Sequence, residues 1–314
     1  MNKKPEILVA PKDIAEMKLL AEAGADAFIV GTEKFMIYGR GYFSDTDLAK
    51  VAALAHQLDK KVYLTIDAIF PNDLLEELAI FLQKVKPMQF DGIRYADLGV
   101  YMLIKEVLPD MPLHFVDQMM LTNYETLNYW AKRGLQRLRI APELTLEEVL
   151  EIKSKAACEV EVLIQGASMM FTSRRKLIEN YLDYQESVGK GVIISKDQNT
   201  LYDPDRKLFY PIIENTHGTH IFSGNDICMI DEMSELLTVG IDAMYIEGFT
   251  CDSEKLVQMV KLYKMAADLA VVEPDKYLKI GAALYVEASK LLGENRVMDR
   301  GFYYKPTIYK NQSR

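Results

Sequence analysis

The chain has 314 residues, which suffices for one large α/β barrel or for two ordinary domains. Its formal net charge of -9 argues against a general nucleic-acid coat protein, because nonspecific phosphate binding requires clustered positive charge. The sequence contains neither a signal-type segment nor an apolar run of about 18 residues, so we expect a cytoplasmic protein without a membrane anchor. Three widely spaced cysteines, Cys158, Cys228 and Cys251, fit reduced thiols better than a disulfide framework.

Short apolar segments alternate with segments whose apolar residues repeat at helical spacing. Tetrapeptides that begin at Gly24, Gly134 and Gly240 resemble one another, which indicates a repeated αβ unit. The expected strands are residues 7–10, 28–30, 62–66, 92–96, 113–116, 137–141, 160–164 and 243–246. Because repeated βα units form parallel sheets, the predicted fold is an α/β protein with a (β/α)8 TIM-type barrel.

The spacing of the last two strands predicts a long insertion. Seven strands fit before about residue 165 and the eighth begins at residue 243, so residues 170–240 are expected to follow strand seven at the active-site end of the barrel. Residues 165–176 are expected to leave a buried strand as an irregular excursion. Residues 1–270 would form the barrel with its insertion. Residues 271–314 would add a helix, expected over 278–292, and a basic, aromatic tail that packs on the barrel or binds single-stranded nucleic acid.

Polar side chains follow several of the expected strands and should converge at the barrel mouth. Carboxylates there suit acid/base work or metal binding, and the alternative is that they cap helices or bond to loops. Glu143 and Glu247 each directly follow an apolar strand. The candidate catalytic residues are Glu143, Glu247, Asp97 and Gln118. The candidate substrate-binding residues include Gln165 and the three consecutive cations Arg174, Arg175 and Lys176, which suit an anion.

Other motifs give little support to a particular chemistry. His217 and His220 could suggest a metal site, but no HExxH or CxxC pattern accompanies them, so we predict structural roles for both and no metal site. Cys228 lies in an apolar run and is interpreted as a buried thiol. The sequence has no Gly-x-Ser-x-Gly elbow, P-loop or GxGxxG motif. No local motif therefore predicts a hydrolase, an NTPase or a dinucleotide-binding protein.

Many short blocks, in order from residue 7 to about residue 304, resemble the collagenase-like peptidases of peptidase family U32. The blocks are Gly24-Ala-Asp-Ala27, Lys61-Val-Tyr-Leu-Thr65, Asp97-Leu-Gly-Val100, Pro112-Leu-His114, Gln118-Met119, Thr122-Asn123, Ala141-Pro-Glu-Leu-Thr-Leu-Glu-Glu148, Gly240-Ile-Asp-Ala243 and Ile246-Glu-Gly248. Despite the peptidase name, the resemblance implies hydroxylation without molecular oxygen, including 5-hydroxyuridine formation in tRNA, with a requirement for prephenate in the RNA branch. Asn123, within one of these blocks, is a further candidate for substrate binding.

The chain departs from the family pattern at the iron–sulfur ligands. Similar family members carry four cysteines, and Met169 and Lys176 stand where the first two would be, while residues 189–203 contain no cysteine. Because neither a thioether nor an ammonium replaces thiolate on iron, we expect no cluster in this chain. It resembles the short, cluster-less member that works beside a cluster-bearing paralogue, so the resemblance implies a heteromer. It leaves open direct tRNA contact and a homodimer when the paralogue is absent.

Three hypotheses follow from the sequence. The first is the cluster-less subunit of a two-component, prephenate-linked tRNA uridine 5-hydroxylation system. The second is a collagenase-like peptidase, and against it no nucleophile–base pair or metalloprotease motif is recognisable. The third is a purely structural partner of a cluster-bearing paralogue.

Overall fold

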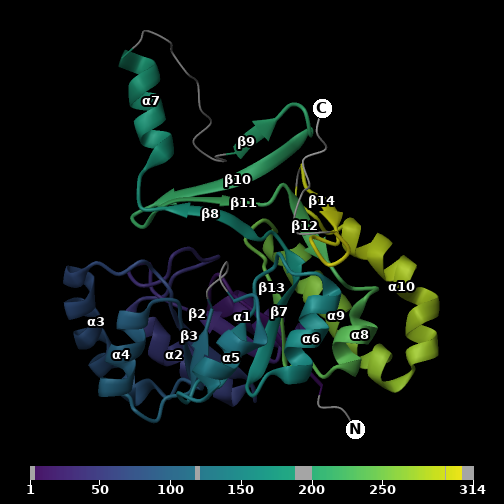
Figure 1. Ribbon diagram of the computed structural model, residues 1–314, viewed down its shortest axis with the longest axis horizontal. Helices are drawn as coiled ribbons and strands as arrows, with labels where there is room; N and C mark the ends of the chain where they lie inside the picture. Colours follow the sequence, from purple (N-terminus) through teal and green to yellow (C-terminus); the bar gives the residue numbers. More distant parts are fainter. Residues whose placement is uncertain (1–3, 117–120, 188–199, 294, 306–314) are drawn as a thin grey trace.

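A computed structural model describes residues 4–116, 121–187, 200–293 and 295–305. Eight parallel strands close into a barrel, because β13 pairs in parallel with both β1 and β7 (Figure 1). The strands are β1 (Glu6–Val9), β2 (Ala27–Val30), β3 (Lys61–Ile66), β4 (Gly92–Tyr95), β5 (Leu113–Phe115), β6 (Arg137–Arg139), β7 (Glu159–Gly166) and β13 (Ala243–Ile246). The predicted (β/α)8 barrel is confirmed.

Helices cover the outside of the barrel, and several of them begin at a side chain that caps them. They are α1 (Ile14–Ala23), α2 (Asp45–Gln57), α3 (Asn72–Val85) with the short 3-10 helix η1 (Lys86–Met88), α4 (Leu98–Val107), α5 (Tyr124–Ala131), α6 (Leu146–Lys155), α8 (Met233–Thr238) and α9 (Ser253–Val272). Ser44 accepts a hydrogen bond from the Asp47 N–H, and Thr145 forms a capping box with Glu148. Gly24 ends α1 with φ +105°, the left-handed conformation that favours glycine. None of the described helices combines the length and apolarity needed to cross a membrane.

The barrel interior contains buried charges where many barrels have branched apolar side chains. Successive side chains of a strand point to opposite faces, so β6 directs Arg137 and Arg139 inward and β7 directs Glu159 and Glu161 inward. Arg137 forms ion pairs with Glu6 and with Glu159 near the start of the strands. The apolar residues between these charges face the helices, so the alternation builds an ionic interior within an apolar shell.

The insertion forms a second, antiparallel sheet that lies across one end of the barrel (Figure 1). Its strands run in the order β8, β11, β10, β9, and helix α7 leaves the sheet after β8. Their bounds are β8 (Met169–Ser173), α7 (Leu177–Ser187), β9 (Thr200–Asp203), β10 (Leu208–Asn215) and β11 (Gly218–Phe222). The expected irregular excursion over residues 165–176 is therefore wrong. Met169 to Ser173 form a strand because they pair with β11, almost 50 residues later, and local sequence does not reveal that pairing.

The C-terminal residues return to the barrel. Helix α10 (Pro274–Ser289) begins earlier than the expected 278, because proline suits the first turn of a helix. Strand β14 (Val297–Asp299), which the sequence did not predict, pairs with β12 (Asn225–Cys228), and β12 pairs with β7. Arg300 lies 2.6 Å from Asp231, and the Tyr303 hydroxyl donates to the Leu163 carbonyl at 3.1 Å. The described part of the tail therefore uses its charges and aromatic rings in contacts with the protein itself.

Candidate functional site at the barrel mouth

Glu247 lies at the end of the barrel that the insertion covers. It follows β13 directly, and its side chain is only 4% exposed. Its carboxylate accepts hydrogen bonds from the hydroxyls of Tyr38 at 2.9 Å and Tyr245 at 2.6 Å, and from the Phe249 N–H at 3.1 Å. Three donors from separate positions fix the orientation of this carboxylate. The structure places Glu247 at the mouth as expected, and its catalytic role stays a prediction.

Gly166, the last residue of β7, lets the backbone of Glu247 approach closely. It has φ +101°, and a Cβ at this position would overlap the carbonyl oxygen of Glu247. The preceding residue, Gln165, accepts the Glu247 N–H at 2.9 Å through its backbone carbonyl. Strand β7 therefore positions Glu247 through a glycine that no other residue replaces without strain.

We expect Gly166→Ala to lower the free energy of unfolding by roughly 3 kcal/mol or more, because it combines left-handed backbone strain with a steric clash. Gly134→Ala is the matched control, since Gly134 has φ +82° but no atom within 4 Å of an added Cβ. The control should cost about 1–2 kcal/mol. Urea unfolding of both variants measures the difference, and equal losses would show that the contact with Glu247 is unimportant.

A small cavity of about 20 Å³ lies beside Glu247, and we call it the mouth cavity. Met36, Tyr38, Gly39 and Arg40 line it from the segment between β2 and α2. From the barrel strands and their ends it is lined by the polar side chains of Thr65, Asp67, Arg94, Arg139, Tyr245 and Glu247. With Ile29 of β2, the mouth cavity therefore joins five barrel strands to the segment that follows β2.

A buried ion pair forms the floor of this region. Both terminal nitrogens of Arg94 donate to Glu161, at 2.6 and 2.8 Å. Burial alone would raise the pKa of Glu161, but Arg94, Arg139 and Arg137 overcome it and lower that pKa to about 2. Glu161 is therefore a fixed negative charge at neutral pH.

Asp67 connects the mouth to the segment after β2. Its carboxylate accepts the Ile37 N–H at 2.9 Å. Burial raises the pKa of Asp67, while that hydrogen bond and the nearby charge of Arg94 oppose the rise. Asp67 thus holds residue 37 against the barrel and adds a second carboxyl group to the lining of the mouth cavity.

Three other predicted residues, Asp97, Asn123 and Glu143, do not line the mouth cavity beside Glu247. Asp97 caps α4 by accepting the N–H groups of Gly99 and Val100, and Asn123 caps α5 by accepting the Thr126 N–H at 2.9 Å. Glu143 is exposed in the turn before α6, and Gln118 lies outside the described residues. The contacts of Asp97 and Asn123 are those of the capping alternative. Their catalytic and binding roles stay predictions.

Gln165 and the three consecutive cations occupy different surroundings. Gln165 is buried, and its side-chain oxygen accepts the Tyr263 hydroxyl at 3.1 Å. Arg174, Arg175 and Lys176 follow β8 and are exposed, and Lys176 lies 2.8 Å from Glu179. The cations therefore remain accessible to an anion, whereas Gln165 is engaged inside the protein.

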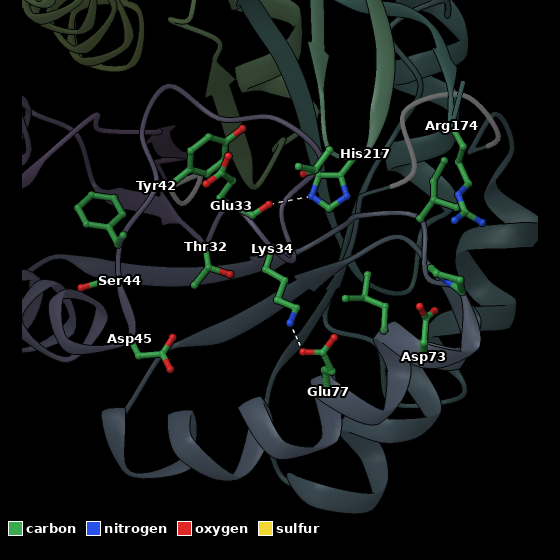
Figure 2. Close-up of a pocket in the computed structure, with 15 residues that line it drawn as sticks. Thr32, Glu33, Lys34, Tyr42, Ser44, Asp45, Asp73, Glu77, Arg174 and His217 are labelled. Atoms are coloured by element: carbon green, nitrogen blue, oxygen red, sulfur yellow. Dashed lines mark hydrogen bonds and ion pairs between the residues drawn. The ribbon is translucent and has the colours of Figure 1, made fainter. Parts of the chain in front are cut away.

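Arg174 borders a larger hollow of about 820 Å³, which we call the insertion cleft (Figure 2). It lies between the segment after β2, the start of α3 and the turn between β10 and β11. Lys34 pairs with Glu77 on its barrel side, and the carbonyl of Glu33 contacts His217 (Figure 2). Acidic and basic side chains are thus mixed in the cleft, which does not form a continuous basic surface.

The two histidines of the His217-Gly-Thr-His220 motif contact different partners. Nε2 of His217 lies 2.8 Å from the Glu33 carbonyl oxygen, and Nδ1 of His220 lies 2.8 Å from the Thr172 hydroxyl. Within the described ranges, no three His, Cys, Asp or Glu side chains are grouped to hold a metal ion. These contacts agree with the structural roles predicted for both imidazoles.

Burial, and then the neighbouring His217, lower the pKa of His220 to about 4. An unfolded histidine binds a proton near pH 6.5, so the unfolded chain binds more protons between pH 6.5 and 4. We therefore expect stability to fall as pH decreases through this range, by on the order of 1 kcal/mol from this residue. Urea unfolding at pH 7 and pH 5 should show a smaller loss for His220→Gln than for the wild type. If His220→Gln loses as much stability between pH 7 and pH 5 as the wild type does, the lowered pKa of His220 is contradicted.

The model of peptidase family U32 matches residues 12–313, nearly the whole chain. The chain belongs to peptidase family U32. It is 38% identical over 311 residues to tRNA hydroxylation protein P2 of Bacillus subtilis, covering 98% of this chain and 100% of that relative. It is 24% identical to tRNA hydroxylation protein P1 of the same organism, covering 88% of this chain and 66% of the relative. With tRNA hydroxylation protein P of Escherichia coli the identity is 27%, over 84% of this chain and 68% of the relative. The chain thus spans all of the short relative and about two thirds of the two longer ones.

The donor set of this U32 protein does not fit an iron–sulfur cluster after β7. Met169 is buried in an apolar cluster with Tyr38 and Phe222, and Lys176 is exposed beside Glu179. Cys228 lies on β12, where burial raises the pKa of its thiol. Thiolates are the ligands that such clusters require, and neither family ligand position in the described residues supplies one.

Sequence reasoning missed the buried arginines of the U32 barrel mouth. Arg94, Arg139 and Glu161 were not among the candidates, although each lies inside the barrel. The available signal was the alternation of charged and apolar residues in Arg137-Leu138-Arg139 and in Glu159-Val160-Glu161. Charges at every second position of a parallel strand indicate an ionic interior.

Proposed function

We propose that this U32 chain is the cluster-less subunit of a two-component, oxygen-independent tRNA uridine 5-hydroxylation system linked to prephenate. The observation that carries the proposal is the end-to-end match, at 38% identity, with a short relative named as a tRNA hydroxylation protein. Relatives named in the same way account for the next three matches as well. The proposal places the protein in the cytoplasm, where its tRNA substrate is found.

The partner is a longer, cluster-bearing family paralogue. Met169 and Lys176 cannot supply thiolates, so a reaction that needs the cluster requires a second chain. Organisms with two such proteins exist, since Bacillus subtilis has both a P1 and a P2 relative. In this proposal the two chains form a heteromer, and the isolated subunit forms a homodimer when its partner is missing.

This subunit contacts tRNA through a local basic surface. Arg174 lines the insertion cleft, Arg175 is exposed next to it in the sequence, and both follow the strand β8. Because the chain carries a net charge of -9, such contact is confined to this surface and weakens steeply with added salt.

The alternative is a collagenase-like peptidase. Thr172 and His220 form a hydroxyl–imidazole contact, the type of pair that a hydrolase would use. However, His220 is completely buried and its pKa of about 4 makes it a weak base at neutral pH. Among the residues that the structure describes, no histidine, cysteine or serine lines the mouth cavity beside Glu247. These observations favour the tRNA hydroxylation hypothesis over the peptidase hypothesis.

Deletion of this gene alone in its host, followed by mass spectrometry of tRNA nucleosides, tests the proposal. We expect 5-hydroxyuridine derivatives to disappear and a plasmid copy of the wild-type gene to restore them. An unchanged nucleoside profile in a host without a redundant paralogue would overturn the proposal. Cleavage of denatured collagen by the stringently purified protein, lost on Glu247→Ala, would then favour the peptidase.

A further inference from the structure

Helix α7 is tied to the insertion sheet by its first turn. The Leu177 N–H donates to the Thr219 hydroxyl at 2.9 Å. The N–H groups of Ile178 and Glu179 donate to the Glu214 carboxylate at 2.8 and 3.0 Å. Beyond this turn α7 stands away from the barrel (Figure 1), and in the part of the chain that the structure describes none of its eleven residues is buried. A single helix of this length is marginal in water, so α7 requires a further contact.

One side of α7 is apolar and the opposite side is acidic. Leu177, Tyr181 and Tyr184 follow one another at intervals of four and three residues, so they lie on one side, which we call the α7 face. Tyr181 is 52% exposed and Tyr184 is 61% exposed. On the other side lie the carboxylates of the helix, Glu179, Asp183 and Glu186. An amphipathic helix normally packs its apolar side against another apolar surface.

The outer face of the insertion sheet adds to the apolar surface beside α7. Thr219, which holds the first turn of α7, and Ile221 lie on the same face of β11, because side chains alternate along a strand. Phe171 of β8 pairs with Ile221 and is 42% exposed. Phe171 therefore lies on the side of the sheet from which α7 rises.

The charges of α7 favour a second copy of this chain, rather than RNA, as the occupant of the α7 face. Residues 177–187 contain three carboxylates and no lysine or arginine, so they repel phosphates. Arg174, Arg175 and Lys176 directly precede the helix, whereas Asp183 and Glu186 lie toward its C-terminal end. Antiparallel pairing of two such helices places the cations of each near the carboxylates of the other. Parallel pairing would place like charges together.

We propose that the α7 face is a self-association surface, on which α7 of a second copy packs antiparallel across a twofold axis. With the axis near Tyr181, the two Tyr181 rings meet and Leu177 of one copy faces Tyr184 of the other. Tyrosine suits such a surface because its ring is apolar and its hydroxyl tolerates water. Two helices of this length cover less area than the roughly 1,200 Å² of a stable interface, so the dimer should be weak, with a Kd of about 10–500 µM.

This inference deepens the proposed function, because it names the surface through which the isolated subunit pairs with its own copy. In that homodimer Arg174 and Arg175 lie near carboxylates of the second copy. Their proposed contact with tRNA therefore belongs to the chain that is not paired with itself.

Sedimentation velocity of the purified full chain, from about 1 µM to 1 mM, should show a reversible monomer–dimer equilibrium. Tyr181→Glu places two carboxylates opposite each other near the axis and should weaken the dimer at least tenfold. Ile80→Glu is the matched control, because Ile80 is an apolar residue of α3 that is 63% exposed and lies outside the α7 face. The control should dimerise like the wild type. Urea unfolding of monomeric Tyr181→Glu should match that of the wild type, because Tyr181 is exposed within one chain.

A disulfide cross-link is a second test of the same geometry. Tyr181→Cys brings two thiols together near the axis, and diamide should oxidise them to an intermolecular disulfide while it is itself reduced to the hydrazine. Asp183→Cys, on the acidic side of α7, is the matched control and should cross-link at least tenfold more slowly. The wild type shows the background from its own three cysteines.

The proposal fails if the wild type stays monomeric up to about 1 mM, if Tyr181→Glu dimerises as the wild type does, or if the two cysteine variants cross-link equally. Other occupants would be revealed by a monomeric wild type. A Tyr181→Glu chain that is less stable in urea would show that the same chain covers the α7 face. A variant of normal stability that loses binding to tRNA or to the longer paralogue would identify that molecule as the occupant.

The two proposals can fail separately. A dimer that depends on Tyr181, together with an unchanged tRNA profile after gene deletion, would overturn the hydroxylation role and leave the α7 surface. Loss of the tRNA modification after deletion, together with a monomeric wild type, would overturn the α7 surface and the homodimer and leave the hydroxylation role.

Discussion

Replacing Glu161 by glutamine is expected to lower the free energy of unfolding by about 3–5 kcal/mol, the usual result of breaking a buried ion pair from one side. Glu161 is completely buried and accepts both terminal N–H groups of Arg94. The variant leaves the Arg94 charge without a carboxylate, and Arg139 loses its closest one as well. Urea unfolding of the wild type and the variant at neutral pH measures the difference.

Two comparisons separate this effect from a general loss of charge. Glu151→Gln removes an exposed carboxylate paired with Lys155 at 2.6 Å, and it should cost less than about 1 kcal/mol. The double variant Arg94→Met, Glu161→Met removes both charges and should be less destabilised than either single variant. Equal losses for Glu161→Gln and Glu151→Gln would contradict the importance of the buried pair.

The same pair predicts part of the acid sensitivity of the protein. The folded pKa of Glu161 is about 2, lower than the usual value of 4.5, so the stabilising charge is fully present above about pH 4.5. Its contribution should be lost progressively as pH falls from 4.5 toward 2. Urea unfolding across this range should therefore show a flatter acid limb for the double methionine variant than for the wild type. An equal loss of stability with falling pH in the two proteins would contradict the lowered pKa of Glu161.

The barrel itself was predictable because its signals are local. Each expected strand is a short apolar run, and residues such as Ser44 and Gly24 mark helix ends by interactions within a few residues. Closure requires only that the last strand reaches the first, and the β13 register with β1 supplies that pairing. Repetition of one local unit thus determines most of the architecture.

The features that escaped prediction depend on contacts between distant residues. Strand β8 exists because it pairs with β11, and β14 exists because it pairs with β12. Likewise, Arg94 and Glu161 are 67 residues apart and meet only after the barrel closes. A single sequence shows the charges but not which of them become neighbours.

Glu143 and Glu247 show how a small error in a strand boundary changes a site prediction. Both were expected to follow an apolar strand directly. Glu247 does so, because β13 ends at Ile246. Strand β6 ends at Arg139 instead of the expected residue 141, and a turn then carries Glu143 to the surface. Three intervening residues are enough to remove a side chain from the mouth.

Glu247→Gln is expected to abolish restoration of tRNA hydroxylation in the deletion strain, with a decrease of about 100-fold or more if the carboxylate takes part in proton transfer. Glutamine retains the size of the side chain but removes the charge held by Tyr38, Tyr245 and the Phe249 N–H. Mass spectrometry of tRNA nucleosides measures the modification, and quantitation of the chain in the same cells measures its accumulation.

Glu147→Gln is the matched control, because it makes the same change at an exposed position in the first turn of α6. It should restore the modification fully. The variant Tyr38→Phe removes one donor to Glu247 without removing the charge, so it should retain more modification than Glu247→Gln. A Glu247→Gln chain that accumulates normally and restores hydroxylation would show that the mouth carboxylate is dispensable. The subunit would then act through its surface, as a structural partner, because the mouth carboxylate would contribute nothing to the reaction.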